Sequence, residues 1–289
     1  MRPGSATASS SWPTRVAAVR TRPGRTGAER GGSAGTDAGS WRTAQGAGEP
    51  TGTASGDGGV PATVVGSLVA LGPLLAAAGL GLGVAAVSEP GQEPAGLAEA
   101  AAAAVMPPRR RLEFLAGRRA ARRALRAVGL DCGEIPRRGR LPVFPPGRAA
   151  SISHSAGIAV AVAAAPGRDL PVGCDLELRP LPREAARLVL CEDEESLLAG
   201  TKLQPGAGAV WPVTALFSAK EAAWKALTVM TVEGREGPAR SLRELRVSPC
   251  RDGLRVCLRA DPAHAVRVRV VRVGAGVFSY VTGRAGTRD

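Results

Sequence analysis

Two acidic side chains one residue apart, Asp175 and Glu177, are the residues whose types and spacing point most directly to chemistry. They end an apolar run that is typical of a strand. Because side chains alternate faces along a strand, both carboxylates would share one face. Two carboxylates a few ångströms apart repel each other unless a cation or protons lie between them. The pair is therefore a candidate cation site; solvated charges at an exposed strand end are the alternative.

A second polar motif, FSAKEAAWK, covers residues 217–225, and 44 positions (221 − 177) separate its glutamate from the one before it. Phe217 and Trp224 are seven residues apart, so they fall on one helical stripe, which we expect to be buried. Glu221 and Lys225 are four residues apart and face the same way on a helix. The motif therefore predicts a helix with one apolar and one charged stripe.

Glu221 has two interpretations. Ser218 and Glu221 fit the S-x-x-E capping box, in which Glu221 would only cap the helix and pair with Lys225. Joined to Asp175 and Glu177, Glu221 would instead complete a site of three carboxylates. An all-oxygen site of this kind suits Mg²⁺, which usually also contacts substrate phosphates.

Three further motifs precede the acidic pair: RLEFLAGR at residues 111–118, RLPVFPPG at 140–147 and SISHS at 151–155. Together with GCDLE at 173–177 and the helical motif, they resemble the 4′-phosphopantetheinyl transferases in order and spacing. The resemblance is to the single-chain, enterobactin-synthase-component-D-like kind that serves siderophore, polyketide and peptide synthetases. It covers about residues 78–285.

The resemblance implies holo-[acyl-carrier-protein] synthase activity: an enzyme that moves the 4′-phosphopantetheine arm of coenzyme A onto a serine of an apo acyl or peptidyl carrier protein. It implies that Mg²⁺ is held by Asp175, Glu177 and Glu221. Glu221, or a metal-bound water, would take the proton from the carrier serine. Lys225 would contact the coenzyme A phosphate and steady the leaving group. Asp175, Glu221 and Lys225 are thus the implied catalytic residues.

The resemblance also implies a pocket for the 3′-phosphate of coenzyme A. Ser153 and His154 would contact this phosphate, and Arg109, Arg138 and Arg140 would complete the pocket, because guanidinium groups bind phosphate through paired hydrogen bonds. For His154 the alternative is a loop histidine with a structural role.

The fold that the resemblance implies is α+β, with two similar lobes related by a pseudo-twofold axis and the site between them. Residues 1–59 are rich in small and basic residues, so we expect a disordered leader. Residues 60–170 would form the N-terminal lobe, and residues 171–285 the C-terminal lobe that carries the metal site.

Local patterns predict several elements directly. Apolar runs at residues 158–165 and 170–176, joined by a turn, predict a β-hairpin. Helices are predicted at residues 109–128 and 193–199. Further strands are predicted at residues 81–88, 254–259, 266–273 and 277–282.

A net charge of +13 predicts anionic partners. Coenzyme A as substrate and acidic apo carrier proteins both qualify, but so does a nucleic acid. The helix predicted at residues 109–128 carries a basic stripe that favours the nucleic-acid alternative superficially: Arg119, Arg122, Arg123 and Arg126. Aromatic residues make up only 3% of the chain, however, too few for a base-stacking platform. We therefore expect no nucleic-acid partner.

The apolar stretch at residues 60–87 is long enough to span a membrane. It is rich in Gly and Ala and contains Pro61 and Pro73, so we expect no membrane span. Five cysteines without a C-x-x-C motif indicate a reducing compartment. We expect a cytoplasmic monomer.

Overall fold

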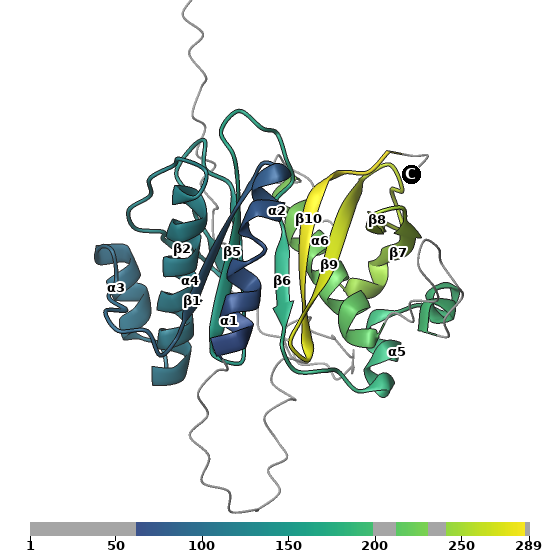
Figure 1. Cartoon of the computed structure of the whole chain (residues 1–289), viewed down its shortest axis with the longest axis horizontal. Helices are drawn as coiled ribbons and strands as arrows, with labels where there is room; N and C mark the ends of the chain where they lie inside the picture. The colour runs from purple at the N-terminus through teal and green to yellow at the C-terminus, as the bar shows by residue number, and fades with distance from the viewer. Residues whose placement is uncertain (1–61, 199–211, 231–240, 287–289) are drawn as a thin grey trace, which may run out of the picture. The chain divides into compact units, whose positions relative to one another are not determined.

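The computed structural model describes residues 62–198, 212–230 and 241–286 (Figure 1). All of these residues belong to one compact unit, Glu49–Asp289. The leader predicted at residues 1–59 lies outside the described residues. The described elements run from α1 to β10 and combine helices with antiparallel sheets, which is compatible with an α+β fold.

The apolar segment that begins the described chain forms two short helices and a strand. They are α1 (Ala62–Val69), α2 (Gly72–Ala77) and β1 (Leu80–Ala86). Among the described residues, no helix is both long and apolar enough to cross a membrane. The candidate membrane span was residues 60–87. Its last part is β1, a strand of the first sheet, which confirms the strand predicted at residues 81–88.

The first sheet has three antiparallel strands in the order β1-β5-β4, where β4 is Ala150–Ser155 and β5 is Ile158–Ala164. The central strand β5 is buried along its whole length. Its larger residues, such as Val160, pack with residues of α1 and α2, whereas its alanines, such as Ala161, pack with a helix on the opposite face. Burial on both faces explains why the sequence of β5 is an unbroken apolar run.

The helix on that opposite face is α4 (Pro108–Arg126), which confirms the helix predicted at residues 109–128. Proline at its start is favourable, because the first helical N–H lacks an intrahelical partner anyway. Glycines on β1 let α4 approach closely: a Cβ at Gly81 or Gly83 would lie 2.2 or 2.0 Å from a carbonyl oxygen of α4. Near α4 lie three smaller elements, α3 (Leu97–Ala104), β2 (Arg137–Arg138) and β3 (Leu141–Pro142).

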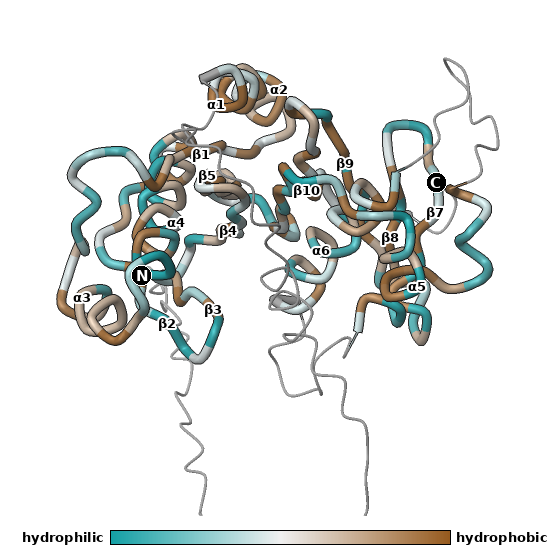
Figure 2. Tube along the Cα trace, turned by 90° about the horizontal axis from the view of Figure 1, so that it is seen from below, coloured by the Kyte–Doolittle hydropathy of each residue, from teal (hydrophilic) through white to brown (hydrophobic). Residues whose placement is uncertain are grey.

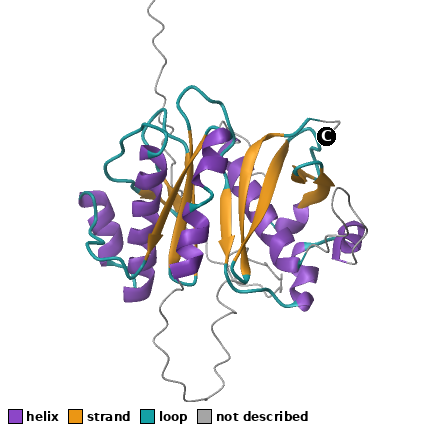
Figure 3. Ribbon diagram, in the orientation of Figure 1, coloured by secondary structure: helices purple, strands orange, loops and turns teal. Residues whose placement is uncertain are grey.

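The second sheet has five antiparallel strands in the order β6-β10-β9-β8-β7. The strands are β6 (Cys174–Glu177), β7 (Leu245–Cys250), β8 (Gly253–Leu258), β9 (Ala265–Val273) and β10 (Gly276–Arg284). Helix α6 (Val213–Met230) packs on this sheet as α4 packs on the first (Figure 3). Short helical turns precede these elements or lie between them: η2 (Arg183–Ala185), α5 (Ala186–Val189), η3 (Glu192–Leu198) and η4 (Leu242–Glu244).

The hairpin predicted from residues 158–165 and 170–176 is wrong. β5 is already paired on both sides, with β1 and with β4, so it has no free edge for the following segment. Only Cys174–Glu177 becomes a strand, and it pairs with β10 of the other sheet. The true hairpin joins β4 to β5 through Ala156 and Gly157, both with positive φ, as a two-residue turn requires.

The predicted C-terminal strands are confirmed as β8, β9 and β10, with ends shifted by one or two residues. Strand β7 was not predicted, because Pro249 weakens its strand pattern; a proline is tolerated there because β7 lies at the edge of the sheet. The helix predicted at residues 193–199 is a 3₁₀ helix, η3, in the described residues.

One apolar core is shared by the two sheets. Figure 2 shows α1 and α2 on the side of the strands opposite to α4 and α6. Below these short helices, buried residues of both sheets form one cluster, to which β5 contributes Val160 and Val162, β6 contributes Cys174 and Leu176, and β10 contributes Phe278. The other face of β6 is therefore left for α6, and it carries the acidic pair.

Candidate functional site

Asp175 is the most buried acidic residue of the predicted site, with no exposed surface. Its Oδ1 atom accepts a hydrogen bond from the Ser153 hydroxyl at 2.9 Å and one from the Lys225 ammonium at 2.8 Å. Its Oδ2 atom is buried and has no hydrogen-bond partner among the described residues. A buried carboxylate oxygen without a partner is costly, so this oxygen is suited to a ligand.

Ser279 adds a second buried oxygen beside Asp175. The two residues lie directly opposite each other in the β6–β10 pairing, so their side chains share one face of the sheet. The Ser279 hydroxyl oxygen is also buried without a hydrogen-bond partner in the described part of the chain. Two unsatisfied oxygens on one face fit a polar or cationic ligand better than an apolar one.

Helix α6 brings the other predicted catalytic residues to this face of β6. Lys225 donates to Asp175 and, at 3.0 Å, to the carbonyl oxygen of Cys174. Burial lowers the pKa of Lys225, but the carboxylates of Asp175 and Glu221 outweigh it, so the net shift is upward and the ammonium form is retained. Glu221, one turn before Lys225, is itself only 4% exposed. The structure therefore brings Asp175, Glu221 and Lys225 together.

The capping-box interpretation of Glu221 is wrong. Helix α6 begins at Val213, so Ser218 lies inside the helix rather than at its N-cap position. The Ser218 hydroxyl donates to the Asp175 carbonyl oxygen at 3.4 Å instead, and Ser218 is fully buried. Glu221 is thus a buried acid in the body of a helix, where a capping role does not explain it.

The donor set of the site fits a hard divalent cation, since carboxylate oxygens are what Mg²⁺ prefers. Glu177, two residues after Asp175 on β6, is partly buried and lies opposite Val277. Asp175, Glu177 and Glu221 do not bring one oxygen each within 4.8 Å of one another. The side chains therefore carry suitable donor chemistry around the unsatisfied Oδ2 atom, although their oxygens are not gathered as a ligand set.

The motif at residues 151–155 is strand β4, not a loop, and its side chains point in two directions. Ser153 is 4% exposed and faces Asp175. His154 points elsewhere: its Nε2 atom lies 2.6 Å from the guanidinium of Arg110. The same Nε2 atom lies 4.0 Å from a carboxylate oxygen of Glu113. The structure thus separates two residues for which one shared role was predicted.

Arg110 was not predicted as a site residue. It lies in the first turn of α4, where the predicted Arg109 instead contacts Glu113 at 3.4 Å with 83% of its side chain exposed. Arg110 also pairs with Glu113, at 3.2 Å. The sequence contains three consecutive arginines at residues 109–111, and only the start of the helix decides which of them reaches β4.

Arg138 and Arg140 are exposed and lie at the turn between β2 and β3. The neighbouring buried Arg118 donates to the carbonyl oxygens of Ile135 and Pro136 and so anchors this segment to α4. Burial lowers the pKa of Arg118 to about 10, and the nearby positive charges of Arg137, Arg122 and Arg110 contribute to this shift. Of the arginines in this region, Arg110 is the one that contacts His154 in the described part of the chain.

Three of the four arginines of the basic stripe on α4 are paired with acidic residues of the protein. Arg122 contacts the buried Glu99 at 2.7 Å, and Arg123 contacts Glu89 at 2.8 Å. Arg119 also reaches Glu89, at 3.3 Å. These arginines neutralise internal acids, so the stripe gives no support to nucleic-acid binding.

A cysteine nucleophile receives no support either. Cys174 is fully buried in the shared apolar core, on the face of β6 away from Asp175. Burial raises the pKa of its thiol to about 11. At neutral pH it stays a thiol, and the thiolate is the reactive form. All five cysteines are free.

A second charged cluster, on another side of α6, is a structural ion-pair network. Lys220 is fully buried, and its ammonium contacts Glu194 and the carbonyl oxygens of Val189 and Leu245, all within 2.9 Å. Cys191 and Asp193 bring ligand atoms close to Glu194, as in a metal site. Arginine and lysine already occupy these carboxylates: Arg259 contacts both acids at 2.8–2.9 Å.

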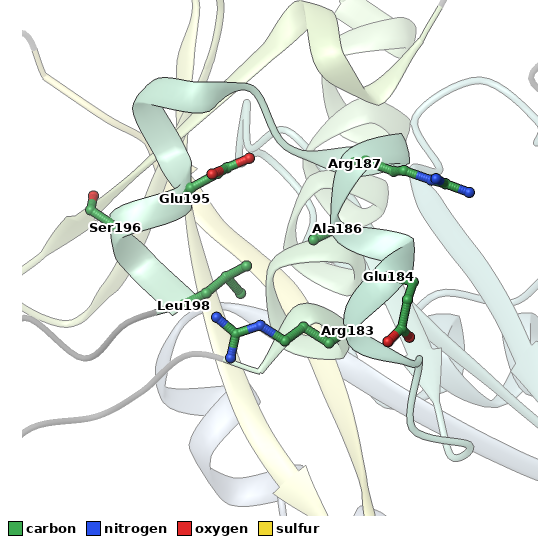
Figure 4. A pocket seen from close by; sticks show the side chains of 7 residues that line it. All are labelled: Arg183, Glu184, Ala186, Arg187, Glu195, Ser196 and Leu198. Carbon is green, nitrogen blue, oxygen red and sulfur yellow. The ribbon is translucent and has the colours of Figure 1, made fainter.

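A surface cavity of about 580 Å³ lies beside this cluster (Figure 4). Residues of η2 and α5 line one side of it and residues of η3 line the other: Arg183, Glu184, Ala186, Arg187, Glu195, Ser196 and Leu198. None of the predicted site residues lines it. Its size alone does not outweigh the buried polar groups around Asp175.

One comparison with known proteins gives a match. Residues 98–164 match the family model described as the 4′-phosphopantetheinyl transferase N-terminal domain. The match supports the 4′-phosphopantetheinyl transferase superfamily, and with it a transferase of phosphopantetheine in general. It covers α4, β4 and β5, whereas Asp175, Glu221 and Lys225 lie beyond it. No curated protein matches the chain.

Proposed function

We propose that this protein transfers the 4′-phosphopantetheine arm of coenzyme A to a serine of an apo acyl or peptidyl carrier protein in a Mg²⁺-dependent reaction. The observation that carries the proposal is the environment of Asp175. A fully buried carboxylate with one oxygen fixed by Ser153 and Lys225 and the other unsatisfied is a poor structural element but a suitable ligand for a cation.

In the proposed reaction the carrier serine oxygen attacks the phosphorus that bears the pantetheine arm. A new oxygen–phosphorus bond forms, and the bond to the nucleotide phosphate breaks and releases adenosine 3′,5′-bisphosphate. Such a transfer depends mainly on positioning and charge neutralisation. Mg²⁺ held by Asp175, Glu177 and Glu221 would neutralise charge on the pyrophosphate.

The chain's own residues supply the rest. The Glu221 carboxylate would accept the proton of the carrier serine, since it is the buried acid on α6 facing the site. The Lys225 ammonium, which stays protonated beside Asp175, would bind the transferred phosphate. His154 and Arg110 would bind the 3′-phosphate of coenzyme A, and the exposed Arg138 and Arg140 would contribute positive charge to the same region.

The proposal includes an arrangement of the chain as two lobes, residues 60–170 and residues 171–285, with the carboxylates on the second lobe. It also includes acidic carrier domains as partners, because the chain carries a net charge of +13. The single-chain type, the cytoplasmic location and the monomeric state are parts of the same proposal.

The test is transfer to a purified apo carrier protein. The full chain, coenzyme A, Mg²⁺ and the carrier are incubated, and the intact carrier is weighed by mass spectrometry. We expect a gain of one phosphopantetheine arm, lost when the carrier serine is replaced by alanine. No gain with several acyl and peptidyl carriers, together with salt-sensitive binding of DNA or RNA, would overturn the proposal in favour of a nucleic-acid-binding protein.

A further inference from the structure

Three serines at alternate positions of β4 form a ladder of hydrogen bonds to residues 174–178, which are β6 and the residue after it. The hydroxyl oxygens of Ser151, Ser153 and Ser155 accept the backbone N–H groups of Cys174, Leu176 and Leu178 at 3.1, 3.2 and 3.1 Å, in that order. The offset between acceptor and donor is 23 residues in all three contacts, so the two segments run parallel.

The ladder joins two sheets that do not otherwise merge. β4 is an edge strand of the first sheet, and β6 is an edge strand of the second. The N–H groups on the outer edge of β6 therefore lack a strand partner, and a buried N–H without an acceptor is costly. Serine hydroxyls replace the missing carbonyl acceptors, so the spacing of the three serines has a structural explanation.

Ser153 differs from the other two serines. While its oxygen accepts the N–H of Leu176, its proton is donated to Oδ1 of Asp175 at 2.9 Å. Lys225 donates to the same oxygen. Both donors therefore engage Oδ1, and the carboxylate is held with Oδ2 unsatisfied. Neither Ser151 nor Ser155 donates to a carboxylate in the contacts that the structure gives.

We infer that Ser153 is a positioning residue that orients the Asp175 carboxylate so that Oδ2 is the oxygen offered to the metal. This inference rests on the proposed function and differs from the role predicted for Ser153, contact with the coenzyme A phosphate. Groups that hydrogen-bond to a metal ligand typically change metal affinity about 10- to 100-fold when they are removed. Ser153 is placed to have such an effect.

Ser151 and Ser155 offer matched controls for a substitution of Ser153, because each also accepts one N–H group of residues 174–178. Ser151→Ala, Ser153→Ala and Ser155→Ala each remove one hydroxyl acceptor of a β6-segment N–H group, but only Ser153→Ala removes a donor to Asp175. Mn²⁺ is titrated into the full-length wild type and each variant without substrate, and free Mn²⁺ is measured by electron paramagnetic resonance. Urea denaturation of each variant measures the structural effect separately.

We expect Ser153→Ala to weaken Mn²⁺ binding about tenfold or more. Ser151→Ala and Ser155→Ala should stay within about twofold of the wild type in Mn²⁺ binding while shifting the urea midpoint in the same direction. Equal Mn²⁺ affinity in Ser153→Ala and the wild type, or equal weakening in all three variants, would overturn the inference and leave the proposed function intact.

A failure of the proposed function would give a different result in the same Mn²⁺ titration. If the wild type binds Mn²⁺ no better than Asp175→Asn, the metal site itself is wrong, and the inference falls with it. Should Ser153→Ala not fold, Ser153→Cys and Ser151→Cys take its place, because a thiol is a weaker donor and acceptor than a hydroxyl. Weaker Mn²⁺ binding in Ser153→Cys alone supports the inference, and equal binding in both contradicts it.

Discussion

Gly173, the residue directly before β6, lies against the carbonyl oxygen of Ala222 on α6. A Cβ added at position 173 would lie 2.0 Å from that oxygen. This contact sets how near α6 approaches β6. Since β6 carries Asp175 and α6 carries Glu221, the glycine helps to fix the separation of the two acids. The G-C-D-L-E motif therefore combines two requirements: a glycine that lets α6 pack closely, and two acidic residues for the site.

We predict that Gly173→Ala destabilises the protein by about 1–3 kcal/mol, because the added methyl must displace backbone. It should also lower the rate of transfer, since α6 has to move away from Asp175. Gly66→Ala is the matched control: a Cβ at Gly66 meets nothing within 4 Å, and the substitution in a helix should stabilise by about 0.5–1 kcal/mol. Similar urea midpoints for Gly173→Ala and the wild type would show that α6 tolerates the methyl.

The buried pair of Lys220 and Glu194 yields a prediction about stability. Lys220→Met removes one of the two cations that contact the buried Glu194 carboxylate and leaves Arg259 and the backbone N–H groups of Cys191 and Val247. Breaking a buried ion pair typically costs about 3–5 kcal/mol. We expect a loss of this size in urea denaturation at pH 7. The double variant Lys220→Met, Glu194→Gln should recover part of it, because the buried negative charge that lost one of its two cations is gone as well. A loss below about 1 kcal/mol in the single variant would mean that the pair contributes little.

The contact between His154 and Arg110 yields a prediction about coenzyme A. If these residues bind the 3′-phosphate, His154→Ala and Arg110→Ala should each raise the Michaelis constant for coenzyme A roughly ten- to a hundred-fold, the worth of one charge-assisted hydrogen bond. The constant for dephospho-coenzyme A, which lacks that phosphate, should change much less. Steady-state transfer assays with both substrates measure the difference.

Arg126→Ala is the control for this experiment. It removes one exposed arginine from the other end of α4, where the side chain only approaches Asp131 at 3.8 Å. It should leave both Michaelis constants unchanged. If His154→Ala affects coenzyme A and dephospho-coenzyme A equally, His154 serves the shape of β4 or the chemistry instead of the 3′-phosphate.

Some of the site could be predicted from sequence because its spacing follows local geometry. A separation of four residues places Glu221 and Lys225 on one face of a helix, and alternation places Asp175 away from Cys174 on a strand. These relations hold wherever the elements form. The structure confirms that Cys174 lies in the apolar core, on the face of β6 away from Asp175.

The rest depends on contacts between distant segments, which local patterns do not encode. The partner of Asp175 is Ser153 because two sheet edges meet, and the partner of His154 is Arg110 because α4 starts at Pro108. The predicted hairpin failed for the same reason: β1, far upstream, occupies the edge of β5 that the next strand would have used. Contacts between segments that are distant in the sequence decided the outcome in each case.

The central claim is that Asp175 is a metal ligand of the transfer reaction, and Asp175→Asn tests it most directly. This substitution keeps the shape of the side chain and removes its charge. Carrier modification by the wild type and by Asp175→Asn is measured by intact mass over a range of Mg²⁺ concentrations, with circular dichroism to confirm folding. We expect a folded variant whose transfer rate is at least about a hundredfold lower, as removal of a group that stabilises the transition state predicts. Near-normal turnover of folded Asp175→Asn at ordinary Mg²⁺ concentrations would contradict the account.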